Sequence, residues 1–464
     1  MSDPKHLVVV SNRGPVRVRG AGARRRIERA AGGLVTALDP VLRERGGVWV
    51  SALETDFPQL VEKGTDDLGY DLVQVDLPKR VRAAYYGDMS NGVLWPTLHS
   101  MPATVSLGTA PWDQYKKANE AFAASAHEAG GPDAIYWVQD YHLLLVPGLI
   151  RATEPRARIG WFCHIPWPGP DLFQTLPWRD EMLEGLLGAD LLGFHTDEYA
   201  GQFLECVARL TGHSVDHDAG TVRYRGRTVR VIGAPIGIPW DQIQELVQTP
   251  DVIARAAQIR GEIHDRPMVL GVDRLDYTKG VPERLAAFER LLAKNPSLRQ
   301  GAVLVQIMVP SREAVGAYQT LKDEVDRMVG DINGRYAVTG RVPIHYYYRS
   351  LNPVDLYAHY VAADVALVTP LRDGMNLVAQ EYCASRRGET GALVLSEFAG
   401  SSHYLHDALL VNPHDVEETT ATLQKALRMR PAEQKRRMHA LRETVRELDV
   451  HRWAGGYLAE LEKA

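Results

Sequence analysis

Short apolar runs alternate with amphipathic stretches such as Pro282–Leu292 and Ser311–Val329, and this alternation constrains the fold more than any other feature of the sequence. Apolar strands separated by helices form parallel sheets that helices cover on both faces. One series of candidate strands comprises Leu7–Val10, Val48–Ser51, Leu72–Val75, Ile135–Gln139, Ile159–His164, Leu191–Phe194 and Val229–Ile232. A second series comprises Met268–Val272, Val303–Met308, Ile344–Tyr347, Val365–Thr369 and Ala392–Ser396.

A chain of 464 residues is too long for one ordinary hydrophobic core. The two series of strands therefore predict an α/β protein with two doubly wound, Rossmann-like domains. We place the junction around Pro235–Pro250. The expected parts are an N-terminal domain over 1–240, a C-terminal domain over 241–445 and a C-terminal helix over 446–464 that crosses back to the first domain. Ligands of such sheets bind beyond the carboxyl ends of the strands, so two facing sheets would form a deep interdomain cleft.

Composition and charge disfavour several classes of partner. The net charge of −5 gives no indication of nucleic acid or of an anionic membrane surface. Cys163, Cys206 and Cys383 lie far apart without metal-binding spacing, and their odd number suits a reducing compartment. The N-terminus lacks the apolar core of a signal peptide, and no apolar run approaches the length of a membrane span. We expect a soluble cytoplasmic protein, and a homo-oligomer is compatible with the sequence.

The stretch Leu367–Tyr382 combines the end of a buried strand, a polar turn and the start of a helix. The turn is Arg372-Asp373-Gly374-Met375-Asn376, and Glu381 lies one turn into the helix. Exposed backbone amides and the helix dipole favour anionic or hydroxyl-rich ligands at such a place. Taken alone, the stretch is equally compatible with a purely structural turn.

Further cations follow other predicted strands. Arg274 and Lys279 flank a turn that Gly280 closes, an arrangement that suits a diphosphate although the spacing is not that of a Walker A loop. Arg13 follows the first strand and Arg312 follows the strand Val303–Met308. The Gly32-Gly33 pair at a helix start lets amides approach a phosphate, with a simple turn as the alternative. The Arg-rich segment 17–29 is either a solvated hairpin or loop, or a lid that attracts phosphate.

Asp140 and His164 end two successive strands of the first series and are expected to converge on one ligand. A carboxylate and an imidazole suit sugar hydroxyls, which donate and accept hydrogen bonds at once. Metal ligation is a rival without an evident third ligand, and buried structural roles are another. Trp95 is either buried or a platform for a sugar. Hydrolase and kinase motifs are absent, and the residues together suit a nucleotide, phosphates and a sugar.

Nine motifs occur in order between about Val8 and Trp453: VVVSNR, AGGL, LWPTLH, WVQDYHLLLVP, HIPWP, GVDRLDYTKG, VPSRE, VTPLRDGMNLVAQEY and VLSEFAG. With these motifs the chain resembles the trehalose-6-phosphate synthases, which are retaining glycosyltransferases of the two-domain GT-B fold. The resemblance implies transfer of glucose from a nucleotide-glucose to glucose 6-phosphate, giving α,α-trehalose 6-phosphate and a nucleoside diphosphate. It also implies no cofactor and no metal.

The resemblance assigns acceptor binding to the N-terminal domain and donor binding to the C-terminal domain. The donor-binding positions are Gly32, Gly33, Arg274, Lys279, Leu351 (at the base), Gly374, Met375, Asn376, Leu377, Val378 and Glu381 (at the ribose). The acceptor-binding positions are Arg13, Tyr86, Trp95 (linked to anomeric selectivity), Asp140 and Arg312. The catalytic set is Arg274, Lys279, His164 and Asp373, of which the last two match residues beside the transferred glucose.

The implied mechanism is a front-face transfer. Arg274 and Lys279 neutralise the leaving diphosphate, and a departing phosphate oxygen takes the proton from the acceptor hydroxyl. Arg13 and Arg312 hold the acceptor phosphate and thereby align the acceptor. No enzymic nucleophile is then required, in keeping with the lack of an obvious glycosidase carboxylate pair.

Three departures from the family pattern concern the acceptor site and the donor turn. Ser51-Ala52-Leu53 occupies a stretch where the family often has tryptophan, Gln380 stands where lysine is common, and Ser401–Tyr404 replaces an Ala-rich turn. The segments WPTLHSMP and WDQYKKANEAFA also resemble glucosylglycerol-phosphate synthases, which use glycerol 3-phosphate. A non-catalytic sugar-phosphate sensor and a transferase joining cyclitols remain alternatives, and the sequence does not choose among UDP-, ADP- and GDP-glucose.

Overall fold

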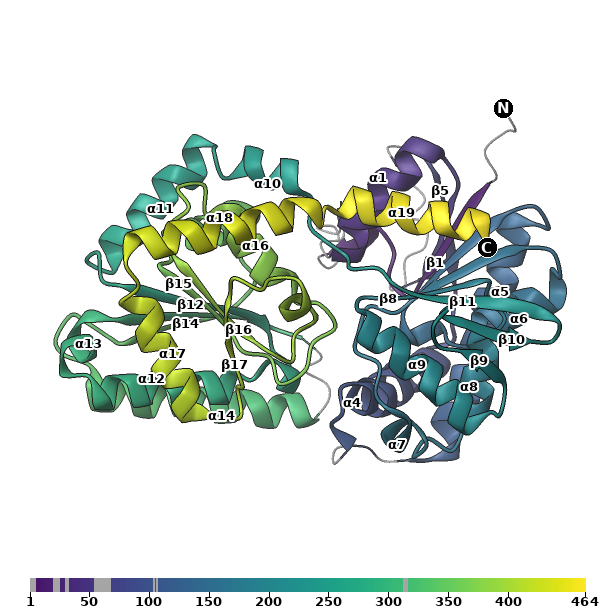
Figure 1. The fold of residues 1–464 in the computed structure, drawn as a ribbon, viewed down its shortest axis with the longest axis horizontal. Helices are drawn as coiled ribbons and strands as arrows, with labels where there is room; N and C mark the ends of the chain where they lie inside the picture. The colour runs from purple at the N-terminus through teal and green to yellow at the C-terminus, as the bar shows by residue number, and fades with distance from the viewer. Residues whose placement is uncertain are drawn as a thin grey trace. The chain divides into compact units, whose positions relative to one another are not determined.

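A computed structural model describes residues 6–19, 26–29, 33–53, 68–102, 105, 107–311 and 316–464. The chain forms two compact units (Figure 1). One unit contains the chain up to Ile236 together with Val450–Ala464, and the other contains Gly237–Asp449. These divisions lie four residues from the boundaries at 240 and 445 that we expected from the sequence.

The first unit is built on a nine-stranded sheet with the order β5-β4-β1-β6-β7-β8-β11-β10-β9. Pairing is parallel from β5 to β11, and β10 and β9 extend the sheet as antiparallel strands. The strands are β1 (Leu7–Ser11), β4 (Val48–Ala52), β5 (Asp71–Val75), β6 (Ile135–Gln139), β7 (Arg158–Phe162), β8 (Leu191–Phe194), β9 (Ser214–Asp216), β10 (Thr221–Tyr224) and β11 (Arg227–Gly233). Because β1, β6 and β7 are neighbours, the residues that follow them meet at one edge of the sheet.

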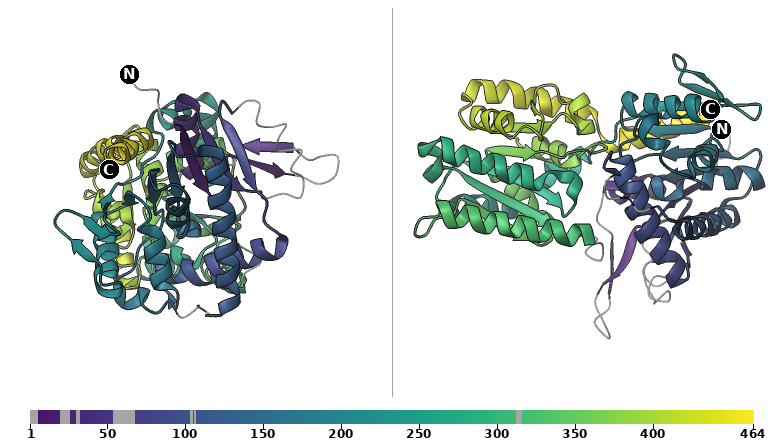
Figure 2. Two further views of the ribbon diagram at one scale, coloured as in Figure 1. Left: turned by 90° about the vertical axis from the view of Figure 1, so that its right-hand side faces the viewer. Right: turned by 90° about the horizontal axis from the view of Figure 1, so that it is seen from below.

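Helices surround this sheet, and β2 (Val16–Arg19) pairs with β3 (Arg26–Arg29) in a separate hairpin that projects from it (Figure 2). The helical segments are α1 (Gly33–Arg45), α3 (Lys79–Arg82), the π-helical η2 (Ala83–Leu94), α4 (Trp95–Leu98), α5 (Thr109–Gly130), η4 (Tyr141–Leu143), α6 (Val146–Thr153), α7 (Pro170–Phe173), α8 (Arg179–Leu186), α9 (Asp197–Leu210) and α19 (Val450–Lys463).

The last helix, α19, packs on β7 and β8 of the first unit. The Tyr457 hydroxyl donates to the carbonyl of Trp161 at 2.9 Å and lies 3.1 Å from the carbonyl of Leu191. Glycines make room for its ring: a Cβ at Gly160 would lie 2.9 Å from the Tyr457 hydroxyl, and one at Gly193 would lie 2.6 Å from the ring. The end of the chain is therefore fitted to the middle of the sheet.

The second unit is built on a six-stranded parallel sheet with the order β14-β13-β12-β15-β16-β17. The strands are β12 (Met268–Arg274), β13 (Val303–Val309), β14 (Ile344–Tyr348), β15 (Val365–Val368), β16 (Ala392–Ser396) and β17 (Leu409–Val411). A separate apolar core fills each face of this sheet. Because β12 and β15 pair directly, the turns that follow them are also neighbours.

Helices lie on both sides of the second sheet (Figure 1). They are α10 (Trp240–Leu246), α11 (Pro250–Glu262), η5 (Tyr277–Lys279), α12 (Val281–Lys294), α13 (Pro296–Gly301), α14 (Gly316–Tyr336), α15 (Pro353–Ala362), α16 (Leu377–Ser385), η6 (Gly400–His403), α17 (Val416–Leu427) and α18 (Pro431–Glu447). Within the described ranges, no helix has both the length and the apolar character that crossing a membrane requires.

The α/β class with two parallel sheets is confirmed. Every strand predicted from the sequence forms, with bounds that differ by at most two residues. The hairpin interpretation of the Arg-rich segment is also confirmed for β2 and β3. The sequence did not predict β9, β10 or β17, which have only three or four residues each.

Candidate active site

In the first unit, the turn after β1 is held by a relay of two hydrogen bonds. The Trp49 indole N–H donates to Ser11 Oγ at 2.8 Å, and the Ser11 hydroxyl donates to the carbonyl of Arg13 at 2.6 Å. Trp49 and Ser11 are buried while Arg13 is exposed. The backbone is thus fixed beneath a guanidinium that faces solvent.

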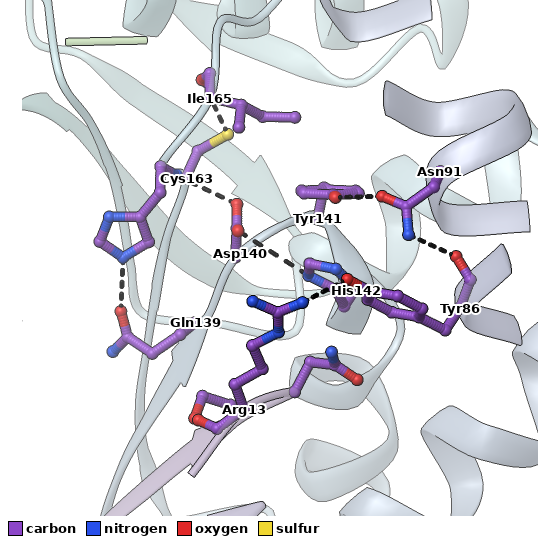
Figure 3. A network of polar contacts seen from close by, with 12 residues as sticks. Arg13, Tyr86, Asn91, Gln139, Asp140, Tyr141, His142, Cys163 and Ile165 are labelled. Carbon is purple, nitrogen blue, oxygen red and sulfur yellow. Dashed lines mark hydrogen bonds and ion pairs between the residues drawn. The ribbon is translucent and has the colours of Figure 1, made fainter. Parts of the chain in front are cut away.

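Arg13 joins a polar cluster at the ends of β1 and β6 (Figure 3). Its Nη2 donates to the Tyr86 hydroxyl at 2.8 Å. The Tyr86 ring stacks on His142 with centroids 5.7 Å apart, and the Tyr86 carbonyl accepts from Asn91 Nδ2 at 2.7 Å. Asn91 Oδ1 in turn accepts from the Tyr141 hydroxyl at 3.0 Å. The structure therefore brings the predicted Arg13 and Tyr86 together and adds three residues that the sequence did not single out.

Asp140 and His164 follow neighbouring strands and contact each other through the backbone of His164, whereas the His164 ring points to Gln139. Asp140 Oδ1 accepts from the backbone N–H of His164 at 3.2 Å, and Oδ2 lies 3.8 Å from His142 Nδ1. Asp140 has a positive φ of 72°, a conformation that is uncommon for a residue with a side chain. Within the described ranges, no group of three His, Cys, Asp or Glu side chains is placed to hold a metal ion.

The His164 ring is held as one neutral tautomer. Its Nε2 lies 2.9 Å from Gln139 Oε1, and Gln139 Nε2 donates to the carbonyl of Trp137 at 3.4 Å. That orientation of the amide makes His164 Nε2 the donor and leaves Nδ1 as an acceptor. Burial and the neighbouring His195 hold the pKa of His164 well below its usual value. The ring can therefore accept a hydrogen bond from a hydroxyl at neutral pH.

Trp95 is buried beside this cluster and leaves only 4% of its surface exposed. Its ring lies 4.0 Å from the centroid of His99 and 5.7 Å from that of Tyr141. Its direct neighbours are thus protein rings, as in the buried alternative considered for this residue. Ala52 is also buried at the end of β4, where its backbone N–H donates to the carbonyl of Asn12 at 3.2 Å.

In the second unit, the turns after β12 and β15 meet through charged side chains. Lys279 Nζ lies 2.6 Å from Asp373 Oδ2, which also accepts from Asn376 Nδ2 at 2.9 Å. The side chains of Lys279 and Asp373 keep only 12% and 14% of their surface exposed. Arg274 ends β12 with an exposed side chain. The two turns predicted to bind one ligand therefore share one polar centre.

Close backbone packing holds the turn before α16. Asn376 has a φ of 70° and accepts from the backbone N–H of Ala379 at 3.3 Å, which caps the helix. The N–H of Ser401 donates to the carbonyl of Met375 at 2.9 Å. A Cβ at Gly400 would lie 1.9 Å from the carbonyl oxygen of Gly374, so only glycine fits there.

Two departures from the family pattern contact each other beneath this turn. Gln380 Nε2 donates to Ser401 Oγ at 3.4 Å, and the Ser401 hydroxyl donates to the carbonyl of Asn376 at 3.3 Å. Both side chains are buried. Because Gln380 and Ser401 are partners, these two departures together support the turn before α16.

Glu381 lies on α16 and accepts from the Tyr360 hydroxyl at 2.8 Å. Burial raises the pKa of its carboxyl to about 7, and the bond from Tyr360 opposes that rise. Leu351 precedes α15 and, like Leu377 and Val378, packs half-buried against the core of the second unit. Gly33 begins α1, whereas Gly32 and Arg312 lie outside the described residues.

Comparisons with known proteins cover the whole chain. The family model described as glycosyltransferase family 20 matches residues 5–463. The trehalose-6-phosphate synthase of Mycobacterium avium is 44% identical, with 99% of this chain and 95% of that protein covered. The corresponding protein of Mycobacterium leprae is 43% identical, with 100% and 97% covered.

Solved structures of trehalose-6-phosphate synthases are also similar to this chain over nearly its full length. A structure described as trehalose-6-phosphate from E. coli bound with UDP-2-fluoro glucose has a TM-score of 0.88 at 33% identity, covering 99% of both chains. An α,α-trehalose-phosphate synthase (UDP-forming) from Burkholderia xenovorans in complex with glucose-6-phosphate has a TM-score of 0.88 at 32% identity, covering 98% of this chain and 100% of that one. The fold is GT-B, and the chain belongs to glycosyltransferase family 20.

Proposed function

We propose that this chain transfers glucose from a nucleotide-glucose to glucose 6-phosphate with retention of configuration, and releases α,α-trehalose 6-phosphate and a nucleoside diphosphate. The observation that carries the proposal is the polar centre of Lys279, Asp373 and Asn376, where two adjacent strands of the second unit end. The likeness to trehalose-6-phosphate synthases over nearly the full length supports it.

On the donor side, we assign the diphosphate to Arg274, Lys279 and the N-terminus of α16. Two side-chain cations and the amides of a helix start stabilise an anion in a partly desolvated site. Asp373 and Asn376 then face hydroxyls of the transferred glucose, and Glu381 accepts from the ribose. Leu351 contacts the base, and Gly32 and Gly33 approach the donor through backbone amides.

On the acceptor side, we assign the sugar phosphate to Arg13 and Arg312, with the Tyr86 hydroxyl beside Arg13. Asp140 binds hydroxyls of the acceptor sugar. The neutral His164, with Nδ1 as an acceptor, receives a hydrogen bond from a hydroxyl of the transferred glucose. Trp95 acts indirectly because it is buried against Tyr141, the residue that follows Asp140.

In the transfer step, the bond between the anomeric carbon of the donor and the diphosphate oxygen breaks as negative charge develops on that oxygen. Arg274 and Lys279 stabilise this charge, which lowers the barrier. The departing oxygen takes the proton of the acceptor's anomeric hydroxyl, whose oxygen attacks the same face of the glucose. We propose that no metal is required, because the two cations supply the stabilising charge.

We also propose a cytoplasmic location. The buried cysteines of this chain form no disulfide, which suits a reducing compartment.

To test the proposal, the purified protein is incubated with UDP-, ADP- or GDP-glucose and glucose 6-phosphate, in buffer that contains a chelator. Mass spectrometry and NMR of the product should identify trehalose 6-phosphate with both anomeric centres in the α configuration. UDP-glucose is the first donor to try, because one neighbouring structure holds a UDP-glucose analogue. A protein that releases no nucleotide with any pair of substrates would be the sensor rather than the enzyme.

A second acceptor is favoured by one observation, the small buried side chain of Ala52 at the end of β4. Where the family often has a tryptophan near the acceptor, alanine changes the size and shape of the site. Glycerol 3-phosphate therefore forms a parallel arm of the same experiment. Glucosylglycerol phosphate as the main product would replace the first proposal.

A further inference from the structure

Arg284 on α12 is a fully buried cation beneath the candidate donor site. None of its side-chain surface is exposed, and its partner Asp273 on β12 keeps only 2%. Lys279 acts electrostatically on the Asp273 carboxyl, so the ion pair lies close to one of the two cations assigned to the diphosphate. Neither Arg284 nor Asp273 was singled out from the sequence.

The guanidinium of Arg284 joins four separate segments of the second unit. Its Nη1 donates to Asp273 Oδ2 at 2.5 Å and to Gln306 Oε1 at 3.0 Å. Its Nε donates to Thr369 Oγ1 at 3.1 Å, and its Nη2 lies 3.5 Å from the carbonyl oxygen of Lys279. These contacts reach β12, β13, the residue after β15 and the turn that presents Lys279.

Two glycines provide the space for this arrangement. A Cβ at Gly271 would lie 2.6 Å from Arg284 Nη1 and 2.5 Å from Gln306 Oε1. Gly280 has a φ of 62°, and a Cβ there would lie 2.1 Å from the carbonyl oxygen of Thr369. The backbone around the guanidinium is therefore shaped to admit it and to keep the Lys279 turn close.

Stability alone does not account for such a pair. Desolvation of two charges offsets much of their attraction, and apolar replacements of similar volume are often as stable. Burial raises the pKa of the Asp273 carboxyl, which the Arg284 guanidinium and Lys279 oppose. With Arg284 in place, the negative charge of Asp273 is compensated close to Lys279, which is assigned to a dianionic diphosphate.

We propose that Arg284 is a positioning residue of the donor site, which fixes the turn that carries Lys279 and compensates the charge of Asp273 near Lys279. The inference rests on the proposed role of Arg274 and Lys279 as ligands of the diphosphate. It predicts that removal of the buried pair weakens donor binding and transfer even when the fold is unaffected.

The test uses the double variant Asp273→Asn/Arg284→Met, because Arg284→Met alone leaves a buried carboxylate unpaired and is expected to unfold the protein. The double variant should melt close to wild type. The nucleotide for the test is whichever of UDP, ADP and GDP the wild-type protein binds. The Kd of the double variant for this nucleotide should rise about tenfold, and its kcat should fall about tenfold. The KM for the acceptor should change less than about twofold. Calorimetry with the nucleotide alone measures the first effect independently of transfer.

Arg260→Met is the matched control at the opposite end of the same strands. Arg260 Nη1 donates to Asp364 Oδ2 at 2.8 Å, and the same oxygen accepts from the backbone N–H of Met268 at 2.8 Å. This pair ties the starts of β12 and β15, so its loss should lower the melting temperature and leave nucleotide affinity unchanged.

Arg284→Lys separates the two parts of the proposed role. It keeps the charge but loses the planar fork that reaches Thr369 and Lys279, so nucleotide affinity should fall although Asp273 stays paired.

A double variant with wild-type nucleotide affinity and kcat would overturn the inference, as would a wild-type protein that binds none of the three nucleotides. A wild-type protein that binds nucleotide but forms no glycoside would instead contradict the proposed function, while the nucleotide-binding comparison would still test the inference.

Discussion

Lys279 Nζ lies 2.6 Å from Asp373 Oδ2, so a carboxylate orients the cation that is assigned to the leaving diphosphate. Both side chains are largely buried, which strengthens the interaction relative to a surface pair. Asn376 binds the same carboxylate oxygen and caps α16. The cation, the carboxylate and the helix start are therefore preorganised together, and a diphosphate would compete with Asp373 for Lys279.

Replacing Asp373 with Asn should have opposite effects on binding and on transfer. Without the carboxylate, Lys279 is available to the diphosphate and one opposing charge is gone, so the Kd for the nucleoside diphosphate should fall about fivefold. Transfer should slow markedly, because the carboxylate no longer accepts from hydroxyls of the glucose. Calorimetry and initial rates measure the two effects. Weaker nucleotide binding by Asp373→Asn would contradict the idea that the diphosphate competes with Asp373 for Lys279.

Glu381 should make nucleotide binding depend on pH. Its pKa of about 7 lies above the usual value because of burial, and ribose hydroxyls that donate to it favour the charged form. Binding should therefore strengthen from about pH 6 to about pH 8 and release a proton near and below pH 7, which calorimetry in buffers of different ionisation enthalpy detects. Glu381→Gln should abolish both effects. Unchanged pH dependence in that variant would assign the titration to another group.

The raised pKa of Glu381 also makes the free energy of unfolding depend on pH in the absence of nucleotide. The folded pKa is raised, so the contribution of Glu381 to stability is fully present below its usual pKa of about 4.5 and is lost as the pH rises through about 7. Nucleotide binding and folding thus respond to pH in opposite directions. Removing the Tyr360 hydroxyl with Tyr360→Phe should move both transitions to higher pH, since that bond holds the pKa down.

Tyr86→Phe removes the hydroxyl that Arg13 donates to at 2.8 Å. Arg13 would then be less well oriented toward the acceptor phosphate, so KM for glucose 6-phosphate should rise about threefold to tenfold with the donor KM unchanged. Tyr136→Phe is the control: its hydroxyl donates to the carbonyl of Gly131 at 2.7 Å and has no role in the proposed site. Equal changes in both KM values would argue against an acceptor role for Tyr86.

Gly193→Ala tests the fit of α19 to the first sheet. A Cβ there would lie 2.5 Å from the Phe162 ring and 2.6 Å from the Tyr457 ring, so unfolding by denaturant should show a loss of about 1–3 kcal/mol. Gly201→Ala on α9 meets nothing within 4 Å and should be neutral or slightly stabilising. If both variants were equally stable, α19 would not be packed as described.

The strand pattern predicted most of the fold. The turns that carry Lys279 and Asp373 could be assigned to one site from the sequence, because each follows a buried strand and parallel strands place such turns at one edge. The contact of Arg13 with Tyr86 could not be predicted, because Tyr86 lies on a π-helical segment and not at the end of a strand. The pairing of Gln380 with Ser401 and the burial of Arg284 depend on side-chain packing, which apolar periodicity does not describe.

The most direct test of the account is the turnover of Lys279→Ala with UDP-glucose and glucose 6-phosphate. Loss of the cation should lower kcat about a hundredfold or more, because the charge that develops on the leaving diphosphate is no longer stabilised. Lys294→Ala, which removes an exposed lysine of α12 paired with Glu417, should retain wild-type turnover. Circular dichroism should show both variants folded. Turnover of Lys279→Ala within about twofold of wild type would contradict the proposed donor site.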